Sequence, residues 1–418
     1  MVSKTKRSVT AVTFCTLCAV YLVNVTITIS SIKSAPEPRQ LQPLPPKKLK
    51  PDEHNRELRK DVIRSPYYPV QLPTYTAELA AQAVRPAPFT CGVKDESAID
   101  PLTQQRPMFS FVHIYKTAGS TMREFFSTYA FICRKGWMCL KCIDLKASSI
   151  KSEGNWKNCQ VEHAVDRNGK IERIGVKRKL YKHVNNPVLR DKFDLFGGHT
   201  RIGAGDNVLN KVGDIHPVRH VVFLRDPMDR YISGVLYQNQ KKKKGWVSAD
   251  FANLIKERVL GSRNAGDYWD RSLSYLLTPS QAEEVQSIKS SFIKTNTTEQ
   301  YAEFKAMTVI NNLMQYNVIL GMTERMPQSM EILKHVLMAN ASKEQEALLD
   351  KKATSQSLNV SKKGGVTTSS VLEELKKDAE FMIEFGEFVK YEKMINDFAM
   401  NMHLMQHEQV VYQSKLTL

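Results

Sequence analysis

The chain has 418 residues, of which 42% are hydrophobic and 17 are Phe, so a wholly disordered chain is excluded and a large core is expected. Its formal net charge is +17, with 60 Lys and Arg against 43 Asp and Glu. Such an excess favours an anionic partner: nucleic acid, anionic lipid, a phosphorylated cofactor or an acidic polysaccharide. A solvated basic surface is the alternative, and charge alone does not decide between them.

The N-terminal segment predicts where the chain resides. Basic residues within residues 1–8 precede a largely uncharged run, residues 9–32, that is long enough to cross a bilayer as a helix. This order predicts a cytoplasmic tail (1–8) and a transmembrane signal anchor (9–32), with the rest of the chain in the lumen, as in a single-pass type II membrane protein. A cleaved signal peptide is the main alternative.

Two further features fit a luminal protein. Residues 33–105 are rich in proline and predict an extended luminal stem, although the part from Tyr67 to Cys91 is apolar enough to pack on the body that follows, residues 106–418. Sequons in polar stretches predict N-glycans on three asparagines, Asn296, Asn340 and Asn359.

The body begins with a strand, a short polar turn and a helix. The alternating apolar run from Phe109 to Ile114 is typical of a buried strand. The turn that follows, Lys116-Thr-Ala-Gly-Ser-Thr121, supplies a positive charge, hydroxyl groups and a glycine, Gly119, that lets the backbone approach a ligand. Such a turn at the start of a helix predicts a phosphate-binding loop. It is not a Walker A loop, because the lysine precedes the glycine.

Residues 131–192 are predicted to be a cysteine-bearing insertion. Part of their spacing resembles that of zinc ligands, and the residues concerned are Cys133, Cys139, Cys142, Cys159 and His163. In an oxidising lumen disulfides are the better interpretation. With Cys91 there are five luminal cysteines, so one is left unpaired, and the sequence leaves the pairing open.

Later patterns predict a parallel α/β sheet. Strand-like runs begin near Phe193, at Val221 and at Asn317, and the second and third lead into helices that open at Pro227 and Pro327. Strands that alternate with helices indicate an α/β fold with a central parallel sheet flanked by helices.

The C-terminal third is predicted to be a loop followed by a helical segment. Residues 341–370 are polar and rich in Lys and Ser, which favours a loop. A capping box at Ser370 and Glu373 then predicts the start of a long amphipathic segment that is broken near Gly386.

Polar residues follow three of the predicted strands. They are the turn from Lys116 to Thr121, Gly197-Gly-His199, and Arg225 with Ser233. In open α/β sheets, ligands bind beyond the carboxyl ends of the strands, so these sets are expected to converge. Arg225 offers a bidentate fork for an anion, and His199 is a candidate base. A ligand with two separated phosphate groups would use both anion sites.

Together these motifs resemble those of the Golgi membrane-anchored carbohydrate (polysaccharide) sulfotransferases, in particular the heparan sulfate 2-O-/6-O-sulfotransferase branch. The 116–121 turn is similar to their 5′-phosphosulfate loop, and Phe223-Leu-Arg-Asp-Pro-x-x-Arg-Tyr-x-Ser233 is similar to their 3′-phosphate motif. Gly321-Met-Thr-Glu-Arg325 resembles a further block, and Phe196-Gly-Gly-His199 resembles the segment that carries the catalytic histidine. The match covers residues 106 to about 400.

The resemblance implies a P-loop-like sulfotransferase fold for a catalytic domain at residues 106–418. It implies 3′-phosphoadenylyl sulfate (PAPS) as donor and a glycan hydroxyl as acceptor in the Golgi lumen, without a metal or nucleic acid. His199 would be the general base, and Lys116 would neutralise charge on the leaving phosphate. The donor-binding residues it implies are Lys116, Thr117, Ala118, Gly119, Ser120, Thr121, Arg225 and Ser233.

Several of these residues have alternatives. Rival bases are His113, His216 and His220, with a packing role favoured for His113. Thr117 also suits a helix cap, and Arg230 suits an ion pair with Asp226. The run Lys241–Lys244 is ordinarily solvated; one hypothesis is that it steers an anionic polysaccharide.

Three other functions compete with this interpretation. A P-loop kinase or nucleotidase is disfavoured by the missing Walker A order. A sulfotransferase for protein tyrosine or another non-glycan acceptor would use the same donor motifs. A non-catalytic luminal protein of the same fold would bind anionic glycans without turnover. The motifs leave the acceptor sugar, its hydroxyl and the oligomeric state open.

Overall fold

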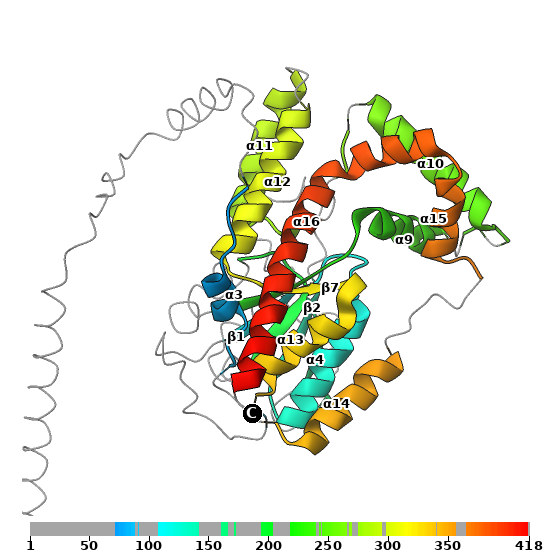
Figure 1. Cartoon of the computed structure of the whole chain (residues 1–418). Coiled ribbons are helices and arrows are strands. Elements are labelled where there is room, and N and C mark those ends of the chain that lie inside the picture. Colours follow the sequence, from blue (N-terminus) through cyan, green and yellow to red (C-terminus); the bar gives the residue numbers. More distant parts are fainter. Residues whose placement is uncertain are drawn as a thin grey trace, which may run out of the picture. The chain divides into compact units, whose positions relative to one another are not determined.

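The computed structural model has a sheet at its centre, surrounded by helices (Figure 1). Within the described residues this sheet has seven strands, in the order β4-β3-β2-β5-β1-β6-β7. The five strands from β2 to β7 are parallel, whereas β3 and β4 add antiparallel pairs at one edge. The predicted α/β fold with a central parallel sheet flanked by helices is confirmed. The strands are β1 (Met108–Val112), β2 (Trp137–Lys141), β3 (Gln160–Val165), β4 (Ile171–Glu172), β5 (Leu195–His199), β6 (Val218–Leu224) and β7 (Ile319–Met322).

The structure describes only part of the chain: residues 72–87, 91, 108–141, 160–165, 171–172, 194–203, 218–239, 242–243, 245–265, 267–269, 275–294, 298–339, 341–356 and 365–416. The predicted tail and signal anchor, the three sequon asparagines and His216 lie outside these residues. In the part of the chain that is described, no helix has the length and apolar character needed to cross a membrane.

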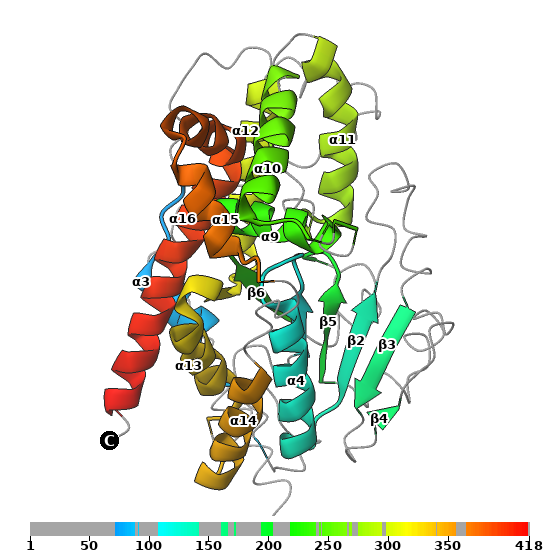
Figure 2. The same cartoon turned by 90° about the vertical axis from the view of Figure 1, so that its right-hand side faces the viewer.

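Helices cover the sheet and extend beyond one end of it (Figure 2). Helices α4, α13 and α14 share a core with β1, β5, β6 and β7, while α9, α10, α15 and the first part of α16 form a second core. The helices are α3 (Ala77–Ala83), α4 (Gly119–Cys133), α9 (Pro227–Asn239), α10 (Ser248–Asn264), α11 (Pro279–Lys294), α12 (Thr298–Gln315), the 3-10 helix η4 (Thr323–Arg325), α13 (Met326–Leu337), α14 (Lys343–Gln356), α15 (Thr368–Lys376) and α16 (Ala379–Leu416).

The central strands are mostly apolar because parallel strands that are covered by helices are buried on both faces. All residues of β1 are buried, and β1 lies between β5 and β6. The strand β2 belongs to the same parallel set, although it lies inside the 131–192 segment that the sequence predicts to be an insertion. The prediction of an insertion is therefore wrong for β2. This strand lies at the edge of the parallel set, and its short sequence, which contains Trp137 and Met138, gives no clear apolar pattern that would distinguish it from a loop.

The predicted boundary between stem and body at residue 106 is also wrong. Residues from Leu72 onward belong to the same compact unit as the rest of the body. Helix α3 buries Ala80 and Ala83, and the Tyr75 hydroxyl accepts a hydrogen bond from Gln406 of α16 at 3.0 Å. The described part of the apolar stretch, residues 72–87, therefore packs on the body.

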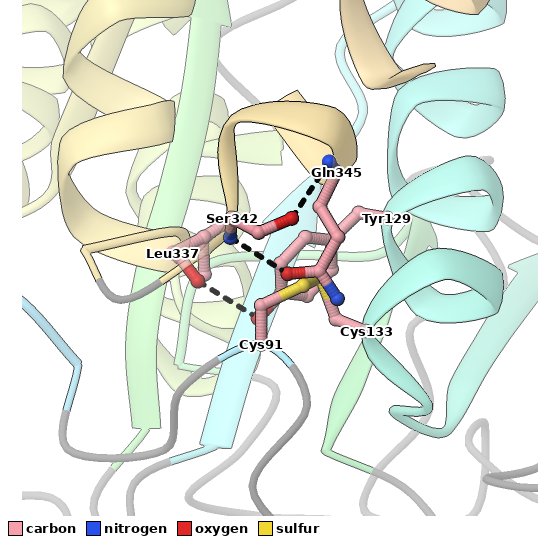
Figure 3. The surroundings of a disulfide bond; sticks show 6 residues. All are labelled: Cys91, Tyr129, Cys133, Leu337, Ser342 and Gln345. Atoms are coloured by element: carbon pink, nitrogen blue, oxygen red, sulfur yellow. Dashed lines mark hydrogen bonds between the residues drawn. A yellow bond between two sulfur atoms is a disulfide. The ribbon is translucent and has the colours of Figure 1, made fainter. Parts of the chain in front are cut away.

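The predicted 341–370 loop contains helix α14, which is a correction to the sequence prediction. Its start is capped reciprocally, since the Gln345 amide donates to the Ser342 hydroxyl and the Ser342 amide donates to the Gln345 side chain (Figure 3). Leu349 is fully buried in the core shared with α4. One buried leucine in a run of charged residues is too weak a pattern to indicate a helix, because its stability comes from the contact with α4.

The helical segment after this region is divided differently from the prediction. Thr367 and Ser370 form the capping box of α15, one turn before the predicted one at Ser370 and Glu373. The break falls at Asp378, whose carboxylate accepts the Phe381 amide at 3.0 Å and caps α16. Helix α16 then continues through Gly386, where the glycine costs a helix only about 1 kcal/mol.

A disulfide joins Cys91 to Cys133, the last residue of α4 (Figure 3). It lies beside Tyr129, whose hydroxyl donates to the Leu337 carbonyl at 3.1 Å. The pairing that the sequence leaves open is thus decided for these two cysteines by the fold. Two of the predicted zinc ligands, Cys142 and Cys159, lie outside the described residues. Among the residues that are described, no three His, Cys, Asp or Glu side chains form a cluster that could hold a metal ion.

Replacing both Cys91 and Cys133 with serine is expected to lower the free energy of unfolding by about 3 kcal/mol, because the disulfide closes a long loop between cysteines that are separated by 42 positions in the sequence. Thermal or urea unfolding of the oxidised wild type and the double variant measures this directly. Equal midpoints for the two proteins would contradict the prediction.

Candidate functional site

The carboxyl ends of β1, β5 and β6 are neighbours in the sheet, so the three segments that follow them meet at one edge. A cavity of about 1140 Å³ lies there. The chain order reverses at β1, with β5 on one side and β6 on the other, which is where open α/β sheets bind ligands. The cavity is lined by residues from the predicted site, namely Lys116, Ala118, Gly119, Ser120, Thr121, His199, Arg225 and Ser233, and by others that include His113, Tyr115, Arg123, Asp229, Tyr237, Thr323, Glu324, Lys334 and Thr367 to Ser369.

The turn after β1 has an unusual backbone. Lys116 and Ala118 have φ angles of 66° and 54°, in the left-handed region that residues other than glycine seldom adopt. Strain of this kind concentrates at ligand-binding loops. Helix α4 begins immediately afterwards at Gly119, and the amides of its first turn have no partners within the helix. The loop therefore presents backbone donors to the cavity, which suits an anion.

Thr117 is the one member of the predicted loop that points away from the cavity. Its side chain is fully buried, and its hydroxyl donates to the Ile114 carbonyl at 2.9 Å. The helix cap itself is Ala118. Thr117 thus holds the turn closed, and the expectation that its side chain binds donor finds no support in its position.

Gly119 is required for a reason that differs from the predicted one. Its own φ is not in the left-handed region, but a Cβ atom built on it would lie 1.5 Å from Nε2 of His113. Real Cβ atoms do not approach other atoms within 3.0 Å. The glycine therefore makes room for the His113 ring.

The Lys116 ammonium group lies against two tyrosine rings. It is 4.3 Å from the centroid of Tyr237 and 5.7 Å from that of Tyr115, and the two rings meet edge to face. Burial lowers the pKa of Lys116, and the nearby Arg225 charge lowers it further. Two cations that repel each other at a cavity wall are stabilised by an anion bound near both.

The anion site after β6 is built on the first turns of α9. Arg225 lies 3.6 Å from the Asp229 carboxylate, and Ser233 follows on the same helix. Burial raises the pKa of Asp229, whereas the Arg225 charge lowers it. An anion that binds Arg225 would therefore compete with a partly buried carboxylate.

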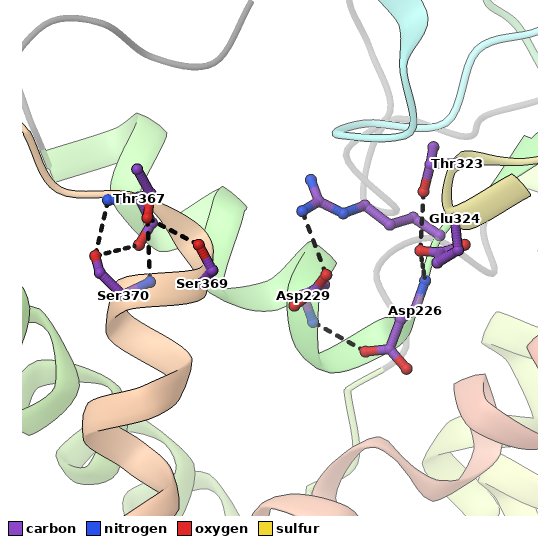
Figure 4. Close-up of polar contacts among 8 residues, drawn as sticks. Asp226, Asp229, Thr323, Glu324, Thr367, Ser369 and Ser370 are labelled. Carbon is purple, nitrogen blue, oxygen red and sulfur yellow. Dashed lines mark hydrogen bonds and ion pairs between the residues drawn. The ribbon is translucent and has the colours of Figure 1, made fainter. Parts of the chain in front are cut away.

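A carboxylate from the 3-10 helix that follows β7 fixes the turn that carries Arg225. Glu324 of η4 accepts the Asp226 amide at 2.8 Å and the Thr323 hydroxyl at 2.9 Å, and Asp226 in turn caps α9 by accepting the Asp229 amide at 3.1 Å (Figure 4). The 321–325 block thus holds the turn that carries Arg225 in place. The sequence alone did not indicate this contact.

His199 ends β5 and lines the cavity. Its Nδ1 lies 3.2 Å from the His113 carbonyl oxygen. Because a carbonyl only accepts hydrogen bonds, we assign the ring hydrogen of neutral His199 to Nδ1, which leaves the lone pair on Nε2. Gly198 before it has a φ of 133°, a conformation that side chains rarely permit, and a Cβ on Gly197 would lie 2.5 Å from the Phe111 Cβ.

The rival bases are less suited to proton transfer. His220 is buried within β6, does not line the cavity, and has its pKa lowered to about 4 by burial. His113 lines the cavity but is almost fully buried, and burial, followed by the charges of His199 and Arg123, lowers its pKa well below the usual value. His113 follows directly after the end of β1, and its burial agrees with the predicted packing role.

Arg230 is paired with a different residue from the one expected. Its guanidinium forms an ion pair with Glu392 of α16 and lies 4.3 Å from the centroid of Trp269, and both charged side chains are buried. Asp226 is instead used as the helix cap. Arg230 therefore joins α9 to α16 and is not part of the cavity.

Sequence reasoning missed several residues of the cavity. Tyr237 could have been found, because it lies one helical turn beyond Ser233 on the same face of α9. Tyr115, Arg123 and the hydroxyl groups at the start of α15 carry no local signal. Of the lysine run, Lys242 and Lys243 are described and exposed, and Lys243 lies over the Trp246 ring at 4.6 Å.

No protein-family model, curated protein or solved structure matches the chain, so its function has to be argued from the residues of this cavity and their geometry.

Proposed function

We propose that the chain is a PAPS-dependent sulfotransferase that transfers a sulfuryl group to a hydroxyl of a glycan, and that it acts in the Golgi lumen from a single-pass type II membrane anchor. The observation that carries the proposal is the cavity itself. Two cationic sites, the 116–121 loop and Arg225 with Ser233, line one cavity together with a histidine whose tautomer suits a base.

The residues of the cavity fit a donor with two phosphate positions. The left-handed loop and the first turn of α4 offer amides and the hydroxyls of Ser120 and Thr121, and Lys116 adds a charge. Arg225 and Ser233 form the second anion site. When bound, PAPS supplies the sulfuryl group and a phosphate as the leaving group.

The proposed reaction assigns a proton and a charge to this chain's residues. His199 accepts the acceptor's hydroxyl proton on Nε2 as the oxygen forms its bond to sulfur and the bond from sulfur to the phosphate oxygen breaks. Lys116 neutralises the negative charge that develops on that phosphate oxygen. Arg225 and Ser233 hold the donor in position and do not react.

The direct test incubates the full-length protein with sulfur-labelled PAPS and a panel of acceptors: desulfated heparan and chondroitin, neutral glycans, and tyrosine peptides. Label in a glycan supports the proposal. Label in tyrosine peptides alone supports the non-glycan sulfotransferase. Glycan binding without transfer of label supports a non-catalytic lectin-like protein, and binding of ATP in preference to PAPS supports a kinase or nucleotidase.

Replacing Arg225 with alanine is expected to remove the preference for a 3′-phosphate. Wild-type protein should bind PAPS about 100-fold more tightly than adenosine 5′-phosphosulfate, which lacks that phosphate, and the variant should bind both about equally. In Arg225→Lys the ratio of the two affinities should fall about 10-fold, because lysine keeps the positive charge but cannot form the bidentate hydrogen bonds of a guanidinium group.

Calorimetry with the two nucleotides measures the ratio. The matched control is Arg258→Ala on the exposed surface of α10, which should bind both as wild type does. An unchanged ratio in Arg225→Ala would place the 3′-phosphate elsewhere.

A further inference from the structure

The ring of His113 lies between the two parts of the site that the proposed reaction uses. One side of it approaches Gly119, at the start of α4, so closely that no Cβ fits there. It also stacks on His199, with ring centroids 4.2 Å apart and 22° between the planes. Phe111 extends the stack, with centroids 5.8 Å apart.

We propose that His113 is a positioning residue, a flat uncharged spacer that sets the place and tilt of the His199 ring relative to the phosphate-binding loop. The inference rests on the proposed function, because it assigns His199 as the base. His113 itself neither takes the proton nor contacts the reacting atoms.

The spacer works through two separate parts of one residue. The main-chain carbonyl of His113 contacts Nδ1 of His199 and thereby selects the tautomer, while the His113 amide donates to Gly198 at 2.8 Å and joins the two strand ends. The ring sets the separation and the tilt. A side-chain substitution therefore removes the spacer but leaves the contact that selects the tautomer.

Charge supports a spacer role over a role in proton transfer. Among the described residues, the titratable and charged groups that interact with the His113 ring are His199 at the end of β5 and Arg123 on α4. The Tyr275 ring in turn lies 6.1 Å from the His199 ring, measured between centroids. Burial lowers the pKa of His113, and the positive charge of protonated His199 and that of Arg123 lower it further, so its ring stays neutral at pH values where an ordinary histidine gains a proton. A base this weak contributes little to proton transfer near neutral pH.

The experiment compares three variants of the full-length protein. His113→Ala removes the ring, His113→Phe keeps a flat ring that never carries charge, and His113→Asn is a smaller flat group in case phenylalanine is too large. For His113→Ala we expect kcat to fall about 100-fold with an unchanged affinity for PAPS, because a base displaced by about 1 Å loses that much. At least one of the flat variants should retain kcat within about 3-fold of wild type.

A second readout is the pH dependence, which loss of stability alone does not move. Without the ring, water reaches one face of His199 and solvates its charged form, so the acid limb of the kcat profile should shift to higher pH in His113→Ala and stay in place in the active flat variant. The pH dependence of carbethoxylation of His199, followed by peptide mass spectrometry, reports the same change without turnover.

The outcomes separate this inference from the proposed function. Absence of sulfotransfer by the wild type on every acceptor overturns the proposed function, and the carbethoxylation curves still test the contact between the rings. If His113→Ala changes neither the pH dependence of carbethoxylation of His199 nor kcat, the spacer role is overturned. It is also overturned if both flat variants bind PAPS normally but lose as much kcat as His113→Ala, which would make His113 a participant in proton transfer.

Discussion

Replacing His199 with alanine is expected to lower kcat for sulfotransfer about 1000-fold while the affinity for PAPS stays as in wild type. The reason is that, in the proposed reaction, Nε2 of His199 accepts the proton, whereas the donor would be held by the 116–121 loop and Arg225. Single-turnover sulfotransfer and calorimetry with PAPS measure the two quantities separately.

The control for this substitution is His335→Ala, which removes a half-buried histidine that bonds Gln413 away from the cavity. It should keep kcat. Full activity in His199→Ala with normal donor binding would show that another group removes the acceptor proton. Loss of donor binding together with activity would instead indicate that His199 shapes the donor site.

Replacing Gly119 with alanine is expected to abolish donor binding and to lower the free energy of unfolding by about 1–3 kcal/mol, the usual cost of overpacking. The new Cβ would lie 1.5 Å from the His113 ring, which cannot move aside because it is stacked on His199 and Phe111. The loop must therefore leave its left-handed conformation. Urea unfolding and calorimetry with PAPS measure the two effects.

A double variant tests the cause of the Gly119 effect. In Gly119→Ala combined with His113→Ala, the methyl group has space, so donor binding should return while kcat stays as low as in His113→Ala. The matched control is Gly261→Ala in α10, where a Cβ meets nothing within 4 Å and helix propensity should raise stability by about 1 kcal/mol. Equal losses in the single and double variants would mean that the clash is not the cause.

Much of the fold could be predicted from local patterns. The buried strand β1 and the second half of β6, from Val221 to Leu224, are mainly apolar, and α9 begins at a proline where the sequence predicts it. The predictions failed where a segment is stabilised by a distant partner. Helix α14 depends on the burial of Leu349, and β2 on its pairing with β5. Neither contact leaves a periodic pattern in its own segment.

The candidate site shows the same division. The sequence by itself determined which residue types are present: a lysine and hydroxyls after one strand, a histidine after another, and an arginine and a serine after a third. Their presence at strand ends follows from the chain's local chemistry, so it could be predicted without a structure.

Only the tertiary structure decided how these residues act on one another. The strand order places β1 between β5 and β6, and this brings His113 against His199 and Lys116 near Arg225. It also decides why Gly119 is needed, since the ring that requires the space is six positions away in the sequence and is held there by a neighbouring strand. The physical reason is that side-chain stacking and charge repulsion depend on distances of a few ångströms, which are set by strand pairing and not by any local pattern.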